Sequence, residues 1–264
     1  MKRGLFIVLE GLDRSGKSSV LSAIKRWLED HKYSAEDIHF PNRKTPIGKK
    51  IDAYLKGSLK LSDEEITSLY SQNRWEVASQ IEESLRAGKC FVSVRYAFSG
   101  AAYSSAKYDP VFVEHWMRED AGLPAPDLTL YLRLSASEAS SRPGFGDEVY
   151  ERAWFQKRVE ECFGSVRAVC EKNGGLWRDI IASGSKEEVK ENVFSTLDDL
   201  KESMTKIQSQ PIKYLWSHSS SQEEAKSEWA DIVSQKRKKR SEQGIVENSA
   251  WEYEKEKKTY DEKK

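Results

Sequence analysis

The sequence has little of what several specialised classes of protein need. Only Cys90, Cys162 and Cys170 are cysteines among 264 residues, and their spacing fits neither a metal site nor an even set of disulfides. This usage predicts a reducing, intracellular compartment. Basic and acidic residues both number 43, so no charge excess indicates nucleic acid or a membrane surface as a partner. Long apolar runs are lacking, and we expect neither a signal peptide nor a membrane span.

Aliphatic residues become scarce after about Trp216. Residues 217–264 are rich in charge and include three consecutive serines and a basic run, Lys236-Arg237-Lys238-Lys239-Arg240. We expect a polar C-terminal extension that is flexible, with a helix as the alternative. The basic run could instead bind a partner protein or an import receptor. The expected localisation is cytoplasmic, with nuclear entry through this run as the alternative.

Residues 11–18, Gly-Leu-Asp-Arg-Ser-Gly-Lys-Ser, fit the pattern of a phosphate-binding loop. An apolar run at 5–9 precedes the loop, and apolar residues at helical spacing follow it, as strand, loop and helix require. The glycines let backbone N–H groups approach phosphate oxygens, Lys17 places a charge on the β- and γ-phosphates, and the Ser18 hydroxyl can bind Mg²⁺. The residues expected to hold the ATP phosphates are Gly11, Asp13, Arg14, Ser15, Gly16, Lys17, Ser18 and Ser19.

Apolar runs alternate with helical patterns up to about residue 205. We expect strands at 5–9, 37–40, 90–94, 128–134 and 176–182, and helices at 47–55 and 187–200. Another helix is expected to start at Ser62, capped together with Glu65, and to run without a break to Gly88. Strands that alternate with helices predict right-handed βαβ units. The expected fold class is therefore α/β, a doubly wound parallel sheet flanked by helices, in a domain of residues 1–216.

Four further stretches follow the loop in a specific order. They are Phe40-Pro41-Asn42-Arg43, Asn73-Arg74-Trp75-Glu76, the run from Arg95 to Gly100, and the run from Gly122 to Asp127. Together with the phosphate loop they resemble eukaryotic thymidylate kinases, which are P-loop nucleoside monophosphate kinases. The resemblance covers about residues 3–216. It implies a P-loop kinase fold and a homodimer that phosphorylates dTMP to dTDP with ATP and Mg²⁺, in dTTP biosynthesis.

The positions of the polar residues agree with this resemblance. Asp13, Arg43 and Arg95 all follow predicted strands, so their side chains can converge at the carboxyl edge of the sheet. The two arginines offer forked donors that suit the phosphate of the acceptor. Tyr70 and Arg74 are four residues apart, hence on one helix face, where a ring and a guanidinium could stack on a base and hydrogen-bond to it.

The resemblance assigns roles to individual residues of the acceptor site. It implies that Tyr70 stacks on thymine, that Arg74 binds the carbonyl edge of the base, and that Asp13 binds the sugar 3′-hydroxyl. Tyr103 is implied to lie beside the deoxyribose. The remaining implied dTMP contacts are Phe40, Arg43, Leu55, Arg95, Ser99, Gly100, Tyr150 and Gln156.

A segment rich in glycine lies at about residues 141–149, between a predicted strand and a helix. We expect a lid that closes over the nucleotides, with Arg142 binding ATP phosphates. Cations must neutralise the charge on the migrating phosphoryl group. The resemblance places the extra arginine within the phosphate loop, at Arg14, so Lys17, Arg14 and Arg95 are the expected catalytic cations. No general base is expected, because the acceptor phosphate is already an anion.

One position departs from the family. The third strand of the family ends in Asp-Arg-Tyr or Asp-Arg-His, whereas this sequence reads Val94-Arg95-Tyr96. In the family this carboxylate lies near the Mg²⁺–phosphate cluster. Ser18, and Glu10 through water, remain as expected metal ligands.

Three hypotheses remain open at this point. The favoured one is a working dTMP kinase, because Lys17, Arg14, Arg43 and Arg74 are all present. The second is a catalytically impaired, nucleotide-binding pseudoenzyme. The third is a kinase of another pyrimidine monophosphate, although Arg74 favours a base with a carbonyl edge.

Overall fold

The computed structural model describes residues 2–107 and 113–216. The predicted C-terminal extension, with its basic run and its suggested partners, lies outside the described residues. In the part of the chain that is described, no helix combines the length and apolar character needed to cross a membrane.

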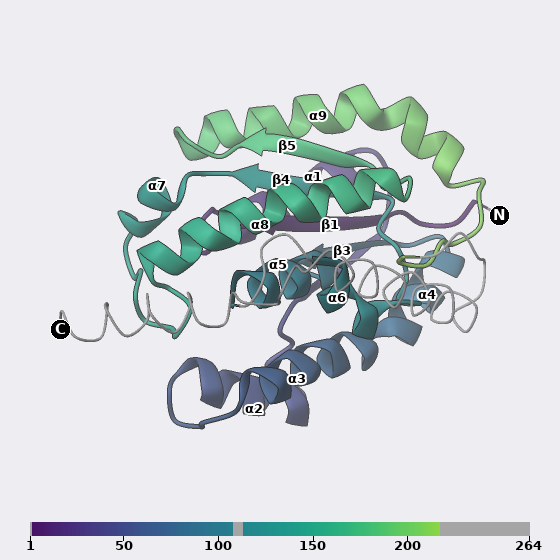
Figure 1. Cartoon of the computed structure of the whole chain (residues 1–264). Coiled ribbons are helices and arrows are strands. Elements are labelled where there is room, and N and C mark those ends of the chain that lie inside the picture. The colour runs from purple at the N-terminus through teal and green to yellow at the C-terminus, as the bar shows by residue number, and fades with distance from the viewer. Residues whose placement is uncertain (1, 108–112, 217–264) are drawn as a thin grey trace.

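The core is a sheet of five parallel strands in the order β2-β3-β1-β4-β5 (Figure 1). The central strand β1 pairs with β3 on one side and with β4 on the other, and its six residues are all buried. Burial on both faces is typical of parallel sheets covered by helices. Every predicted strand is present with ends within two residues of those expected, as β1 (Phe6–Gly11), β2 (Ala35–His39), β3 (Cys90–Val94), β4 (Leu128–Arg133) and β5 (Trp177–Ile181).

Helices cover both faces of this sheet. In Figure 1, α5 packs against α8 on one face, and α1 packs against α9 on the other. The predicted fold class, a doubly wound α/β sheet, is therefore confirmed. The described helices are α1 (Lys17–Asp30), α2 (Pro46–Leu55), α3 (Asp63–Trp75), α4 (Ala78–Arg86), α5 (Ala97–Lys107), α6 (Val113–Met117), α7 (Ala136–Ser140), α8 (Ala153–Lys172) and α9 (Lys186–Ile207), with a 3₁₀ turn at Arg118–Asp120.

The single helix predicted from Ser62 to Gly88 is wrong in one respect. Its capped start is present, because the Glu65 N–H donates to Ser62 Oγ (3.2 Å) and the Ser62 N–H donates to Glu65 Oε2 (2.7 Å). The helix breaks after Trp75, however, and α4 begins at Ala78. Asn73 near the end of α3 is fully buried and bonds to the segment after β2, whereas α4 packs on β3. The two halves therefore pack against different partners, although no Gly or Pro marks the break.

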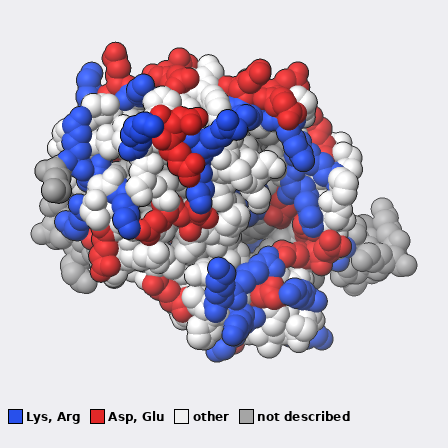
Figure 2. Space-filling model, turned by 180° about the vertical axis from the view of Figure 1, so that it is seen from behind, with Lys and Arg blue, Asp and Glu red and all other residues white. Residues whose placement is uncertain are grey.

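Helices α2 and α3 form an arm that projects below the sheet in Figure 1. The side chains of Lys44, Lys49, Lys50 and Lys56 on and beside α2 are exposed. Figure 2, from the opposite side, shows basic side chains gathered on this projection. The α2 part of the arm thus presents positive charge, whereas α3 begins with Asp63, Glu64 and Glu65.

Candidate active site

The phosphate loop lies between β1 and α1, as the motif requires. Gly11 and Gly16 have φ angles of 141° and 96°, which favour glycine. A Cβ atom at Gly11 would lie 2.9 Å from the Leu132 carbonyl oxygen of β4, so only glycine fits there. Lys17 is the first residue of α1, and the exposed Ser18 and Ser19 follow it. The free N–H groups at this helix start suit a bound phosphate.

Lys17 is folded back into its own loop. Its ammonium group donates to the carbonyl oxygens of Gly11 (3.1 Å) and Leu12 and to Ser15 Oγ (3.2 Å). Burial, together with the nearby charge of Arg95, lowers the pKa of Lys17 to about 7. A bound phosphate would add negative charge beside this group and favour its protonated form.

Arg95 and Asp13 form the centre of a fixed polar cluster. Arg95 directly follows β3 with a φ of 65°, and its Nη2 lies 2.5 Å from Asp13 Oδ1. Tyr103 donates to the other Asp13 oxygen (2.9 Å), as does the side-chain amide of Gln156 (2.9 Å). Burial acts to raise the pKa of Asp13, but the charges of Arg95 and Lys17 outweigh it and lower this pKa below its ordinary value. Asp13 is thus an ionised, immobilised carboxylate.

Glu10 holds the start of α5 to the end of β1. Its side chain is fully buried, and it accepts hydrogen bonds from the N–H groups of Tyr96 (3.0 Å) and Ser99 (2.9 Å) and from the Ser99 hydroxyl. Burial raises the pKa of Glu10, against the lowering effect of Arg95. Both carboxylate oxygens are therefore engaged with protein groups, and a role for Glu10 as a metal ligand through water stays a prediction. Val94 is buried in β3, next to this cluster.

An open cavity of about 890 Å³, including its mouth, lies beside the loop. Every residue predicted to contact dTMP lines it, except Gln156. The buried Gln156 lies behind the wall, where its Oε1 accepts from the Asp13 N–H (3.1 Å) while its Nε2 donates to the Asp13 carboxylate. Gln156 therefore orients Asp13 in this structure. The predicted lining residues are Asp13, Phe40, Arg43, Leu55, Tyr70, Arg74, Arg95, Ser99, Gly100, Tyr103 and Tyr150.

The other two arginines of the cavity differ in their surroundings. Arg43 is exposed and pairs with Asp52 and with Glu148 of the lid (2.6 Å). Arg74 is 4% exposed and forms a two-pronged ion pair with Asp120. Arg43 is therefore placed to meet an incoming anion, whereas Arg74 is fixed in the wall.

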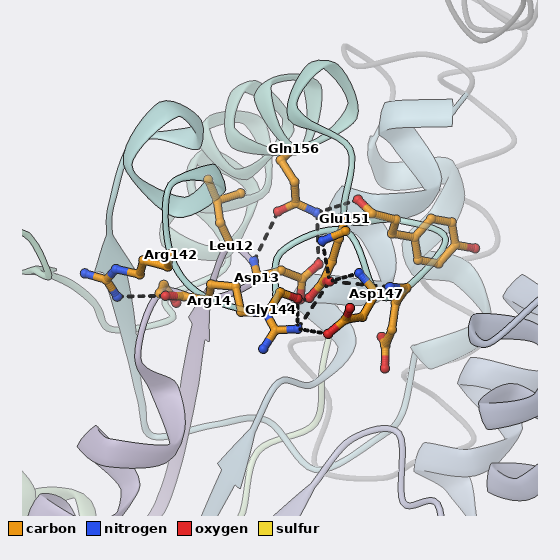
Figure 3. Close-up of polar contacts among 12 residues, drawn as sticks. Leu12, Asp13, Arg14, Arg142, Gly144, Asp147, Glu151 and Gln156 are labelled. Atoms are coloured by element: carbon orange, nitrogen blue, oxygen red, sulfur yellow. Dashed lines mark hydrogen bonds and ion pairs between the residues drawn. The ribbon is translucent and has the colours of Figure 1, made fainter. Parts of the chain in front are cut away.

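The lid contacts the phosphate loop directly (Figure 3). Arg14 Nε donates to Glu151 Oε1 (2.9 Å), and its Nη2 donates to the Gly144 carbonyl oxygen. The other Glu151 oxygen accepts from the N–H groups of Gly146 and Asp147, both at 2.9 Å. The hydrogen bond with Glu151 raises the pKa of Arg14. Arg14 is thus held by a carboxylate that lies just after the lid, and its role at the phosphates stays a prediction.

Arg142 of the lid bridges two segments. Arg142 Nη1 donates to the Arg14 carbonyl oxygen (2.7 Å), and its Nη2 donates to that of Ala182 (2.9 Å), just after β5. At its other end the lid touches the arm, because the Val149 N–H donates to the Leu55 carbonyl oxygen (3.1 Å). The lid therefore connects the phosphate loop with the mouth of the cavity.

Sequence reasoning missed three charged residues of this region. Asp120 carried no signal except its position shortly before the run from Gly122 to Asp127. Glu151 follows Tyr150, yet its acceptor role depends on how the lid folds. Lys107, at the end of α5, donates to Asp63 (2.7 Å) and lies 4.8 Å from the ring centre of Tyr150, a contact that only the tertiary structure creates.

The site combines a phosphate loop at the carboxyl edge of a parallel sheet with an arginine-lined cavity beside it. A lid contacts both the loop and the mouth of the cavity. This arrangement defines a P-loop phosphotransferase whose acceptor carries an anionic group.

The chain belongs to the thymidylate kinase family, because the family model described as thymidylate kinase matches residues 9–193. It is 40% identical over 216 residues to a thymidylate kinase of Arabidopsis thaliana, covering 81% of this chain and 78% of that one. It is 38% identical over 216 residues to the human thymidylate kinase, covering 81% of this chain and 98% of that one. The solved structure of a thymidylate kinase from Candida albicans matches with a TM-score of 0.69 and 34% sequence identity. The match covers 81% of this chain and 99% of that one. The family resemblance predicted from the motifs is confirmed, and with it a kinase.

Proposed function

We propose that the protein transfers the γ-phosphoryl group of ATP to the phosphate of dTMP, which yields ADP and dTDP. The observation that carries this proposal is the arginine-lined cavity next to the phosphate loop. Arg95 lies at the end nearest the loop, where its Nη1 also donates to the Gly11 carbonyl oxygen (3.2 Å). A phosphate held by Arg95 would therefore lie close to the loop that holds the donor.

The remaining lining residues suit a pyrimidine nucleotide. Asp13 and Tyr103 offer a carboxylate and a phenol to the sugar, and the Tyr103 hydroxyl donates a hydrogen bond to Asp13. Tyr70 and Arg74 lie one helical turn apart on α3 and both face the cavity, as the stacking and edge-binding roles require. An acceptor without a phosphate would leave Arg43 and Arg95 without the anion that these forked donors suit.

The protein would promote phosphoryl transfer by positioning the two nucleotides and by neutralising the charge on their phosphates. Lys17 would exchange its loop carbonyl partners for phosphate oxygens, and Arg14 would exchange Glu151 for them. Arg95 neutralises the acceptor phosphate, and the lid excludes water, which would otherwise accept the phosphoryl group. No side chain needs to remove a proton, because the acceptor oxygen is already ionised.

We propose Mg²⁺ as the cofactor. Ser18 is exposed, and none of the described residues hydrogen-bonds to its hydroxyl. No cluster of three His, Cys, Asp or Glu side chains suited to a metal occurs among the described residues. This donor set fits a cation that takes most of its ligands from phosphates and water. When bound, Mg²⁺ would neutralise negative charge on the ATP phosphates.

A side-by-side comparison of acceptors tests the proposed function. Rates of ADP formation would be measured with dTMP, dUMP, UMP, dCMP and thymidine. We expect dTMP to be the best acceptor and thymidine to be inactive. The Candida albicans relative is described as having broad substrate specificity, so the full panel is needed. Equal rates across the panel would contradict the assignment.

We also propose a homodimer, on the family resemblance alone, and a cytoplasmic location, on the cysteine usage. Sedimentation of the purified chain would show about twice the monomer mass of 30.3 kDa. Imaging of fluorescent fusions with and without residues 217–264 would show whether the basic run directs the protein to the nucleus.

A further inference from the structure

Asp120, in the 3₁₀ turn that contacts α3, fixes the guanidinium of Arg74. Arg74 Nε donates to Asp120 Oδ1 (3.0 Å), and Nη2 donates to Oδ2 (2.7 Å). Both side chains are almost completely buried, at 5% and 1% exposure. A two-pronged pair of this kind sets the plane of the guanidinium as well as its position.

Ser71 fixes Asp120 in turn. Its hydroxyl contacts Asp120 Oδ1 (2.9 Å) and the Glu119 carbonyl oxygen (3.0 Å). Ser71 belongs to α3, as Arg74 does, and Asp120 ends the 3₁₀ turn at Arg118–Asp120. The three residues thus join the arm to the body of the molecule at the wall of the cavity.

Gly100 of α5 limits the guanidinium from a third direction. A Cβ atom at this position would lie 2.8 Å from Arg74 Nη2 and 3.2 Å from both Cζ and Nη1. The guanidinium therefore rests against a bare backbone, and its plane has no room to swing towards α5. Gly100, like Asp120, therefore restricts the position of the Arg74 guanidinium.

One nitrogen of Arg74 stays available under these constraints. Asp120 takes the Nε–H and one N–H of Nη2, and none of the described residues accepts a hydrogen bond from Nη1. Arg74 lines the cavity, so a base bound beside Tyr70 meets a donor whose direction is set in advance. A 4-oxo pyrimidine can accept this hydrogen bond, whereas the 4-amino group of cytosine presents a second donor and leaves both unpaired.

We propose that Asp120 is a positioning residue that sets the base selectivity of the acceptor site. It does so by holding Arg74 in one orientation, with Nη1 free to donate to the base. The inference rests on the proposed function, because it assumes a pyrimidine nucleotide in this cavity. A freed Arg74 could rotate away from a 4-amino group and would discriminate less against cytosine.

The test compares Asp120→Asn with Asp127→Asn, a matched change in another buried ion pair. Arg3 and Asp127 form a two-pronged pair of similar burial (2.7 and 2.6 Å) that also binds the Phe6 N–H at the opposite end of β1. Dissociation constants of dTMP, dUMP and dCMP would be measured by calorimetry on the full chain, alongside kcat and KM. Melting curves would confirm that each variant is folded.

Asp120→Asn is expected to weaken dTMP binding about 10- to 100-fold and to reduce the preference for dTMP over dCMP by at least about 10-fold. The preference for dTMP over dUMP should stay unchanged, since both bases carry a 4-oxo group. Asp127→Asn should lower stability only. Ser71→Ala, which keeps the ion pair, should shift the same preference by a few-fold, and it replaces Asp120→Asn if that variant does not fold.

An unchanged dTMP-to-dCMP preference in a folded Asp120→Asn variant would overturn the inference, as would an equal loss in Asp127→Asn. Failure of the proposed function has a different signature, because the unmodified chain would then bind dTMP no better than the other nucleotides. Binding without turnover leaves the selectivity test intact.

Discussion

At the scale of single residues, Glu10 shows that a buried carboxylate near a phosphate loop can serve the scaffold. Its oxygens accept hydrogen bonds from Tyr96 and Ser99, and Arg95 directly precedes Tyr96 in the sequence. The place of Arg95 in the cavity therefore depends on Glu10. This connection explains why a carboxylate is needed at the end of β1 without assigning it to the metal.

Glu10→Gln is expected to destabilise the fold by about 1–3 kcal/mol, because an amide cannot accept at both ends. Turnover should fall as Arg95 loses its support, while the Mg²⁺ concentration that gives half-maximal rate should stay the same. Thermal melting and Mg²⁺ titrations check both points, with Ser99→Ala as the control for the hydroxyl contact. A strongly raised Mg²⁺ requirement at unchanged stability would show instead that Glu10 serves the metal.

Val94 can be tested by restoring the carboxylate of the family. Val94→Asp is expected to raise turnover at limiting Mg²⁺ by about 10-fold, if it acts as other groups around a metal do. It should also lower stability, since Val94 is buried. The uncharged Val94→Asn separates charge from shape, and rates would be measured across a Mg²⁺ titration. No change at any Mg²⁺ concentration would count against a metal-related role for this position.

At the scale of elements, the lid is organised by one carboxylate. Glu151 accepts hydrogen bonds from three lid N–H groups and from the guanidinium of Arg14, so it ties the fold of the lid to the phosphate loop. ATP phosphates would compete with Glu151 for the same arginine. If Arg14 binds ATP as proposed, we expect closing and opening of the lid to be coupled to occupation of the donor site.

Glu151→Gln is expected to speed hydrogen exchange at the Gly146 amide by about 10-fold, because a neutral acceptor binds it less strongly. Exchange measured by mass spectrometry or NMR on the unliganded protein checks this. Asp147→Asn is the control, since the Asp147 side chain is 74% exposed and 3.4 Å from Arg14. Equal protection of Gly146 in Glu151→Gln and the unmodified chain would mean that the lid is held by other contacts.

The helices and strands also show which features of the fold could be predicted from the sequence. The strands and the cap at Ser62 were predictable because apolar runs and capping pairs are local signals. The break between α3 and α4 was not, because it arises from the different packing partners of Asn73 and α4. The residues lining the cavity could be predicted from motifs, whereas Asp120 and Glu151 act through contacts that only the folded chain brings together.

At the scale of the whole molecule, the last described residues close the domain. Leu215 exchanges backbone hydrogen bonds with Gly122 (3.2 Å) and Leu123 (2.7 Å), and the Trp216 ring lies 5.5 Å from that of Phe98. These contacts hold residues 214–216 against the segment before β4. The proposed domain of residues 1–216 therefore ends on a packed aromatic side chain.

A chain of residues 1–216 is expected to melt within a few degrees of the full chain and to keep its dTMP kinetics. A chain ending at Lys213 should be less stable, because it loses three side chains that are each at most 8% exposed. Calorimetry and steady-state rates of both truncations provide the measurement. Loss of activity in the 1–216 chain would place part of the C-terminal extension within the enzyme.

Formation of dTDP from ATP and dTMP is the measurement that tests phosphoryl transfer at this site most directly. Products would be separated by chromatography across a Mg²⁺ titration, with Lys17→Ala as the paired variant. Mg²⁺-dependent dTDP formation that disappears in Lys17→Ala is the expected result. Tight binding of both nucleotides without dTDP at any Mg²⁺ concentration would contradict it and identify a nucleotide-binding protein that has lost turnover.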